Sequence, residues 1–189
     1  MFAALSQHIK AVEDNLASYV ALGPVAFLTN MQSDILKKLQ KPHLTEILLK
    51  SGVKSLLYSN NQQIFNLVSN ACQVDRATCR DGLFVISEKN NSVNNVDRMP
   101  VVLGHYPSGS STKNFDHFYQ CANKGIFSKY DYGAKGNMKV YGSKEPPVYE
   151  VKNITFPVHL MAGYYDRLAD MKDVELLYER LKCEKVHVS

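Results

Sequence analysis

The position best suited to chemistry is Asp166, an aspartate at a break between two regular patterns. Before it, the apolar run at 156–162 is typical of a buried strand, and Gly163 with two tyrosines ends that run. After it, apolar residues recur at helical spacing from Val174 onward. Functional side chains in open α/β sheets lie at the carboxyl ends of strands, so Asp166 is the candidate catalytic acid. The structural alternative is an aspartate that only shapes a turn.

Other reactive side chains show no pattern that indicates a metal or cofactor. The four cysteines lack zinc-ligand spacing, and no cofactor or metal is predicted. Cys72 and Cys79 are close enough in sequence to bridge within a loop. Cys121 and Cys183 are interpreted as isolated thiols.

Composition and charge exclude several classes of protein. The 189 residues are 45% hydrophobic and 21% charged, which is typical of a globular domain with a core. The net charge of +4 comes from scattered basic residues without interleaved aromatics, so no nucleic-acid partner is expected. No apolar run reaches the length of a transmembrane helix, and the first residues do not resemble a signal peptide. The number of subunits stays open.

The elements expected around Asp166 alternate between strand and helix. A helix is predicted at 2–14, a strand at 17–22 and further strands at 156–162 and from Lys185. A helix is expected to begin at Ser111 and end at Gly125, and another to begin at Asp170. Helices without a convincing strand are expected between about 29 and 100, and a polar connection at 130–151. This order predicts a parallel α/β sheet that carries a helical insertion.

Four stretches, in this order, resemble the acid lipases of the α/β-hydrolase fold, the family of gastric and lysosomal acid lipases. They are YVALGPVAFL at 19–28, GHYPSGSSTKNFDHFYQ at 104–120, the segment at 129–158 with Tyr-Asp-Tyr-Gly and Pro-Pro-Val-Tyr, and GYYDRLADMKDV at 163–174. The last is similar to the family pattern Gly-Gly-x-Asp-x-Leu-Ala-Asp-x-x-Asp-Val. The resemblance covers nearly the whole chain.

The resemblance implies a partial α/β-hydrolase with a cap. It assigns 1–28 to the hydrolase core, 29–110 to a helical cap or lid, and 111–189 to the part of the core that carries the acid residue. Asp166 matches the aspartate of a Ser–His–Asp triad, which orients the histidine. Asp170 and Asp173 match acids with capping roles. Cys72 and Cys79 match a region with a cap disulfide, and the apolar residues expected to line an acyl site or to pack on the core are Ile35, Leu36, Leu39, Ile47, Leu48, Leu56 and Leu57.

Two triad members are not expected within these residues. The nucleophile requires Gly-x-Ser-x-Gly, which the sequence lacks, and Ser108 has the wrong spacing. His187 is expected to be an ordinary strand residue. The resemblance places the serine elbow before Met1 and the histidine after Ser189, so the chain is expected to be a fragment that is inactive and folds poorly alone.

The expected function is hydrolysis of neutral lipid esters, with a triacylglycerol, a steryl ester or a lipid–water interface as partner. A secreted or lysosomal location is expected for the full protein, together with sequons for N-glycosylation at Asn90 and Asn153. One alternative is a non-catalytic, lipid-binding remnant. Another is an unrelated α/β protein in which Asp166 is a turn residue.

Overall fold

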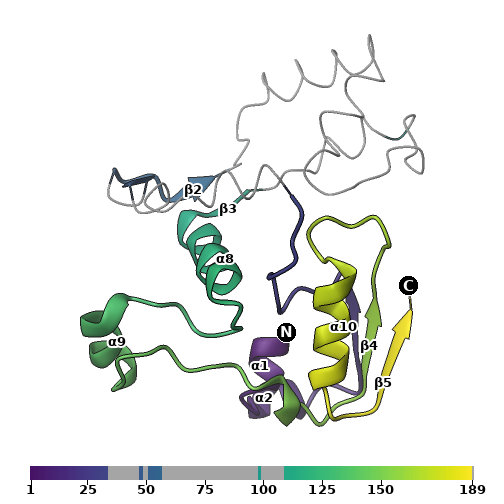
Figure 1. Ribbon diagram of the computed structural model, residues 1–189. Coiled ribbons are helices and arrows are strands. Elements are labelled where there is room, and N and C mark those ends of the chain that lie inside the picture. The colour runs from purple at the N-terminus through teal and green to yellow at the C-terminus, as the bar shows by residue number, and fades with distance from the viewer. Residues whose placement is uncertain (34–46, 49–50, 57–97, 99–108, 189) are drawn as a thin grey trace. The chain divides into compact units, whose positions relative to one another are not determined.

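A computed structural model describes residues 1–33, 47–48, 51–56, 98 and 109–188 of the chain (Figure 1). The chain divides into two compact units. One unit contains Met1–Gln32 and His117–Ser189, and the other contains Ser33–Asp116. Asp166 belongs to the first unit, which is the better described of the two.

The first unit contains a three-stranded parallel sheet (Figure 1). Strand β4 (Val158–Met161) lies between β1 (Tyr19–Leu22) and β5 (Lys185–Val188). Tyr19 pairs with Val158, and Val158 pairs with Lys185. The three strands expected from the sequence are therefore present, with shorter bounds than predicted for the first two. Strand β4 pairs with one strand of this chain along each edge.

One face of this sheet is buried in the core of the unit. Val158 and Leu160 of β4 are completely buried, and Ala21 of β1 lies beside Leu160. Helix α10 (Met171–Arg180) contributes Val174 and Leu177 to the same core. The other buried apolar members come from the N-terminal residues, the segment after β1, the turn before β4, the loop before α10 and the end of α10: Phe2, Leu5, Ala26, Phe27, Val151, Ile154, Ala169 and Leu181. Burial of this apolar surface is the main stabilising contribution to the unit.

The opposite face of the sheet carries exposed apolar side chains. Val20, His159 and Val186 form one row across the three strands, and Leu22 lies beside Met161 in the next. The exposed fractions are 50% for Val20, 75% for Leu22, 41% for Met161 and 46% for Val186. Parallel sheets are normally covered on both faces. Within the described part of the first unit, this second face has no such cover.

The N-terminal segment forms two short helices rather than the single helix predicted at 2–14. Helix α1 spans Phe2–Leu5 and α2 spans Lys10–Glu13. The side chains of Ser6 and Gln7 both donate to the carbonyl oxygen of Ala3, at 3.1 and 2.9 Å, and His8 has a φ of 51°. Polar side chains that bond to nearby backbone compete with helix continuation, and a left-handed residue ends it.

Helix α8 (Thr112–Lys124) agrees with the sequence prediction at both ends. The hydroxyl oxygen of Ser111 accepts a hydrogen bond from the backbone N–H of Asn114 at 3.0 Å, which is an N-cap. Gly125 follows the last residue with a φ of 64°. Just before the helix, β3 (Ser110–Ser111) pairs antiparallel with β2 (Ser55–Leu56) in the second unit. The expectation of no strand between 29 and 100 was therefore wrong for these two residues, because β3 supplies a partner from outside that region. The helices expected there lie almost entirely outside the described residues.

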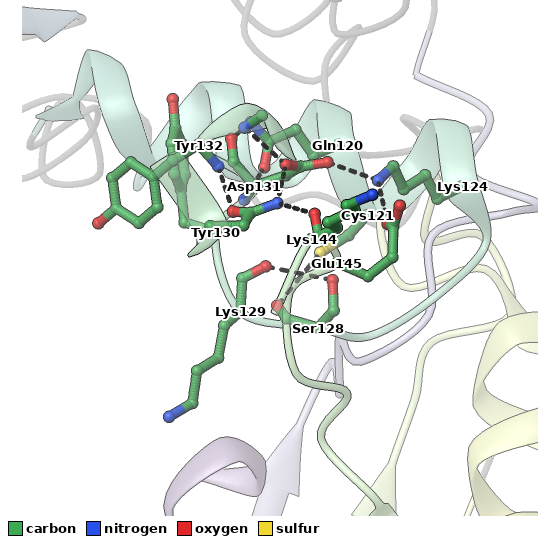
Figure 2. Close-up of polar contacts among 12 residues, drawn as sticks. Gln120, Cys121, Lys124, Ser128, Lys129, Tyr130, Asp131, Tyr132, Lys144 and Glu145 are labelled. Carbon is green, nitrogen blue, oxygen red and sulfur yellow. Dashed lines mark hydrogen bonds and ion pairs between the residues drawn. The ribbon is translucent and has the colours of Figure 1, made fainter. Parts of the chain in front are cut away.

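The polar connection expected at 130–151 contains a helix, α9 (Gly133–Tyr141), and a 3₁₀ turn, η3 (Val151–Asn153). Asp131 links α8 to α9, because it bonds Lys124 of α8, as Figure 2 shows, and the buried Asn137 of α9. One carboxylate oxygen of Asp131 accepts from Asn137 at 2.7 Å, and the other accepts from Nζ of Lys124 at 2.6 Å. Gln120 bonds both the N–H and the carbonyl oxygen of Asp131. This tertiary network stabilises a helix that contains Gly133 and Gly136, two residues that disfavour helix in a sequence prediction.

Candidate functional site

Asp166 lies at the carboxyl edge of the parallel sheet, in the loop between β4 and α10. The neighbouring strand β1 ends at Leu22 and is followed by Gly23 at the same edge. The backbone N–H of Gly23 donates to the carbonyl oxygen of Met161 at 2.8 Å, which continues the pairing of the two strands beyond their ends. Two loops from adjacent strands therefore meet beside Asp166.

The two oxygens of the half-buried Asp166 carboxylate have different surroundings. Oδ1 accepts hydrogen bonds from the backbone N–H groups of Leu168 at 2.7 Å and Ala169 at 3.0 Å. Oδ2 has no hydrogen-bond donor among the described residues. It lies over Gly23, since a Cβ atom built on that glycine would be 3.5 Å from it. One oxygen is thus held by the loop and the other is left with acceptor capacity.

The bonds of Oδ1 are those expected of an aspartate that shapes a turn. One oxygen is therefore enough for the structural alternative, in which Asp166 is only a turn residue. The remaining oxygen can accept an N–H from a further group. In a Ser–His–Asp triad, the aspartate accepts the Nδ1–H of the histidine and so fixes the tautomer of the imidazole. The geometry of Asp166 is compatible with this role, and it does not require it.

The loop that carries Asp166 is held against the segment after β1 by two buried carboxylates. Asp170 is the N-cap of α10, where it accepts from the backbone N–H of Lys172 at 3.1 Å, and it also accepts from Nε2 of Gln32. Asp173 accepts two hydrogen bonds from Asn30, one from the backbone at 2.8 Å and one from the carboxamide at 2.9 Å. Asp170 therefore has the capping role predicted for it. The capping role predicted for Asp173 was wrong, because this residue lies in the first turn of α10 and both of its carboxylate oxygens accept hydrogen bonds from another segment.

The sequence prediction missed Asn30 and Gln32. Gln32 also donates its backbone N–H to the carbonyl oxygen of Arg167, next to Asp166. The signal that could have indicated such partners is the pair of aspartates itself, since carboxylates that become buried need hydrogen-bond donors. Which residues supply these donors could not be read from the sequence.

The described histidines do not complete a catalytic pair with Asp166. The side chains of His8, His117 and His159 are described, and none of them bonds to Asp166. Nε2 of His117 lies 2.7 Å from the carbonyl oxygen of Ser128, in the segment that follows α8. His187 is in β5, paired with Leu160, as expected of a strand residue. His43 and His105 lie outside the described residues.

The described residues contain no cluster of three or more potential metal ligands. Among the helices that the structure describes, none has the length and apolar character needed to cross a membrane. Cys121 and Cys183 are free thiols. The cysteines of the predicted bridge, Cys72 and Cys79, lie outside the described residues. So do most of the residues of the predicted cap, including Ile35, Leu36, Leu39 and Leu57.

The fold and the site define part of a parallel α/β protein with an aspartate at the carboxyl edge of its sheet. The known proteins to which this chain is similar are lipases. Mouse gastric triacylglycerol lipase is 32% identical over 176 residues, covering 90% of this chain and 44% of that protein. Triacylglycerol lipase 2 of Arabidopsis thaliana is 32% identical over 193 residues, covering 96% and 43%. Lipase lipl-1 of Caenorhabditis elegans is 38% identical over 118 residues, covering 60% and 29%.

The chain is thus homologous to lipases of the acid lipase family, and the resemblance seen in the sequence is confirmed. It spans less than half the length of these curated relatives. No family model matches the chain.

Proposed function

We propose that this chain carries the acid residue of a lipase that hydrolyses carboxylic esters of neutral lipids, either triacylglycerols or steryl esters. The observation that supports this role for Asp166 is the asymmetry of its carboxylate. Two backbone N–H groups hold Oδ1, and Oδ2 keeps its acceptor capacity at the carboxyl edge of the sheet. The lipase relatives supply the class of reaction.

In the proposed mechanism, a serine attacks the ester carbonyl and a histidine takes the proton of that serine. The histidine then protonates the departing alcohol. In the second half-reaction the histidine takes a proton from the water that attacks the acyl-enzyme, and it returns that proton to the serine. Oδ2 of Asp166 accepts the Nδ1–H of the histidine and stabilises the imidazolium that forms in each half-reaction. The bonds to Leu168 and Ala169 fix the direction of the carboxylate before the substrate arrives.

The serine and the histidine of this mechanism belong to parts of the lipase that precede and follow these 189 residues. The relatives align with this chain over less than half of their own length, which leaves room for both. The segment 29–110 is proposed to form a cap that contacts the lipid substrate at a lipid–water interface. The whole protein is proposed to be secreted or lysosomal.

Two experiments test this proposal in order. The first is to sequence the transcript across both ends of this reading frame. A Gly-x-Ser-x-Gly elbow upstream and a histidine loop downstream are expected. A message that begins at Met1 and stops after Ser189 would overturn the proposal of an enzyme. The alternative would then be a lipid-binding remnant, and binding of residues 1–189 to lipid vesicles would test it.

The second experiment replaces Asp166 by Asn in the whole protein. The Asn side chain keeps the shape but cannot stabilise the imidazolium, so kcat on a triacylglycerol emulsion should fall by roughly 10⁴-fold. Asp14→Asn is the matched control, because Asp14 is exposed and lies at the C-cap of α2, away from this loop. Equal activity of the two variants would leave Asp166 with a structural role only.

A further inference from the structure

We propose that Asn153 is an N-glycosylation site of the protein. This inference rests on the secreted or lysosomal route included in the proposed function, and it does not depend on catalysis. The acceptor pattern Asn-x-Ser/Thr is met by Asn153, Ile154 and Thr155. Because such tripeptides arise by chance, the structure around the site has to support the assignment.

The three residues of the sequon alternate between solvent and core. Asn153 and Thr155 are exposed, whereas Ile154 between them is only 2% exposed and belongs to the hydrophobic core. Asn153 ends the 3₁₀ turn η3, where its backbone N–H donates to Glu150 at 2.9 Å. The backbone N–H of Ile154 donates to Val151 at 3.1 Å. The buried apolar residues anchor the turn, so the acceptor and the hydroxyl are presented on its outer side.

A glycan at this position would not displace any interaction of the described fold. Neither the Asn153 carboxamide nor the Thr155 hydroxyl makes a hydrogen bond within the described residues. A modified asparagine therefore leaves no buried partner unsatisfied, which would otherwise cost about 1–3 kcal/mol per group. Glycans are bulky and hydrophilic, and an exposed turn is where such a group can be accommodated.

The chemistry is a group transfer from a lipid pyrophosphate-linked oligosaccharide. The carboxamide nitrogen of Asn153 forms a bond to the anomeric carbon of the sugar, and the bond from that carbon to the pyrophosphate oxygen breaks. The nitrogen loses one proton, and the lipid pyrophosphate leaves with the electron pair. Nothing is oxidised or reduced.

The site lies at the opposite edge of the sheet from the candidate catalytic acid. Asn153 precedes β4 and Asp166 follows it, so the four residues Val158–Met161 lie between them along the strand direction. At about 3.3 Å per residue, the strand alone separates the two edges by more than 10 Å. A glycan on Asn153 therefore leaves the approach to Asp166 open.

The test uses the whole protein purified from its own cells and treated with an amidase that releases whole N-linked glycans by hydrolysing the glycosyl-asparagine bond. The enzyme converts the glycosylated asparagine to aspartate, so peptide mass spectrometry assigns the site. The peptide that contains Asn153 is expected to carry this conversion. Recovery of that peptide with an unmodified asparagine throughout would overturn the proposal, whether the protein is exported or stays in the cytosol.

Variants expressed through the secretory pathway separate loss of the glycan from loss of folding. In an Asn90→Gln background, Thr155→Val should reduce the mobility shift on deglycosylation by the mass of one glycan, and Thr155→Ser should keep it. The same preparations are assayed for ester hydrolysis, which is expected to be unchanged by Thr155→Val. A glycan without lipase activity would overturn the proposed function alone, and lipase activity with an unmodified Asn153 would overturn this inference alone.

Discussion

Asp173 accepts two hydrogen bonds from Asn30, although 143 positions separate the two residues in the sequence. Oδ2 accepts the backbone N–H at 2.8 Å and Oδ1 accepts the carboxamide at 2.9 Å. Asp173 is only 2% exposed, so these donors replace the water that its carboxylate loses on folding. The pair joins the segment after β1 to the start of α10, and the loop with Asp166 lies between β4 and that helix.

The first prediction concerns the stability contributed by this pair. Asn30→Ala removes the carboxamide donor from a buried carboxylate, which should lower the free energy of unfolding by about 1–3 kcal/mol. Asp173→Ala should cost at least as much, because it leaves the Asn30 donors without their acceptor. In the double variant the two losses should not add, with a coupling energy of about 0.5–3 kcal/mol. Urea denaturation of the whole protein measures all three values.

Glu175→Gln is the control for that cycle, since Glu175 is an exposed acid in the same helix. Its effect on stability should stay within about 0.5 kcal/mol. Additive losses for Asn30 and Asp173 would contradict a direct interaction between them.

Local patterns in the sequence were enough to predict the parts of the site that depend on one element. The apolar run of β4, the cap at Asp170 and the position of Asp166 between them are all properties of one continuous stretch. The bonds from Asn30 and Gln32 depend on where a distant segment lies once the strands have paired. No local propensity encodes that relationship, so the support of the Asp166 loop could not be predicted.

The second prediction concerns Gly23, which has a φ of 58° beside Oδ2 of Asp166. Gly23→Ala should destabilise the fold by about 1–2 kcal/mol, because an L-residue is strained in this conformation. It also places a methyl group against the oxygen that is proposed to bind the histidine. At 3.5 Å this methyl group does not force the carboxylate to move, but it narrows the space in which the imidazole would approach Oδ2. The kcat on an ester substrate should therefore fall by up to about 10²-fold. Steady-state kinetics and thermal denaturation measure the two effects separately.

Gly142→Ala provides a matched comparison. Gly142 has a φ of 71°, and a Cβ atom there would meet nothing within 4 Å. The two alanine variants should lose similar stability, but only Gly23→Ala should lose activity. A similar loss of activity in both would mean that the effect of Gly23→Ala comes from general destabilisation.

The third prediction concerns the pH dependence of the network in Figure 2. The hydrogen bond from Lys124 is the main cause that lowers the pKa of Asp131 below its ordinary value of 3.8, and bonds from Asn137 and Gly133 act in the same direction. A lowered folded-state pKa means that the stabilisation is present above pH 3.8 and is lost as the pH falls through the folded-state value. The same hydrogen bond raises the pKa of Lys124 above 10.5, so its stabilisation is present below that pH and is lost as the pH rises through the raised value.

The stability difference between the wild type and Asp131→Asn should therefore be constant from mildly acidic to mildly alkaline pH. It should decrease only below pH 3.8 or above pH 10.5. Glu145→Gln is the control, because the Glu145 carboxylate also lies near Nζ of Lys124, at 3.8 Å. A difference that disappears near pH 6 would show that another group controls the network.

Helix α9 shows how tertiary contacts can override a weak local preference. The sequence prediction for this region was a connection rather than a helix, because the region contains Gly133, Gly136 and Gly142. In the fold, Gly136 lies so close to Tyr132 that an added Cβ atom would be 2.5 Å from the Cβ of that tyrosine. The glycine therefore permits a close approach inside the helix, and the bonds from α8 supply the stability that its composition lacks.

The last prediction concerns the exposed face of the parallel sheet, where Leu22 is 75% exposed beside Met161. If residues 1–189 are produced alone, this face should bind a hydrophobic dye and promote self-association. Leu22→Lys should then increase the monomeric fraction in size-exclusion chromatography. Met138→Lys, which changes an exposed residue of α9, should have little effect. In the whole protein, the same substitution should be unfavourable. If other parts of the protein cover the sheet, Leu22→Lys should lower the free energy of unfolding by at least about 1.5–3 kcal/mol, the value of burying a leucine side chain. A whole protein as stable with lysine as with leucine would mean that this face stays open to solvent.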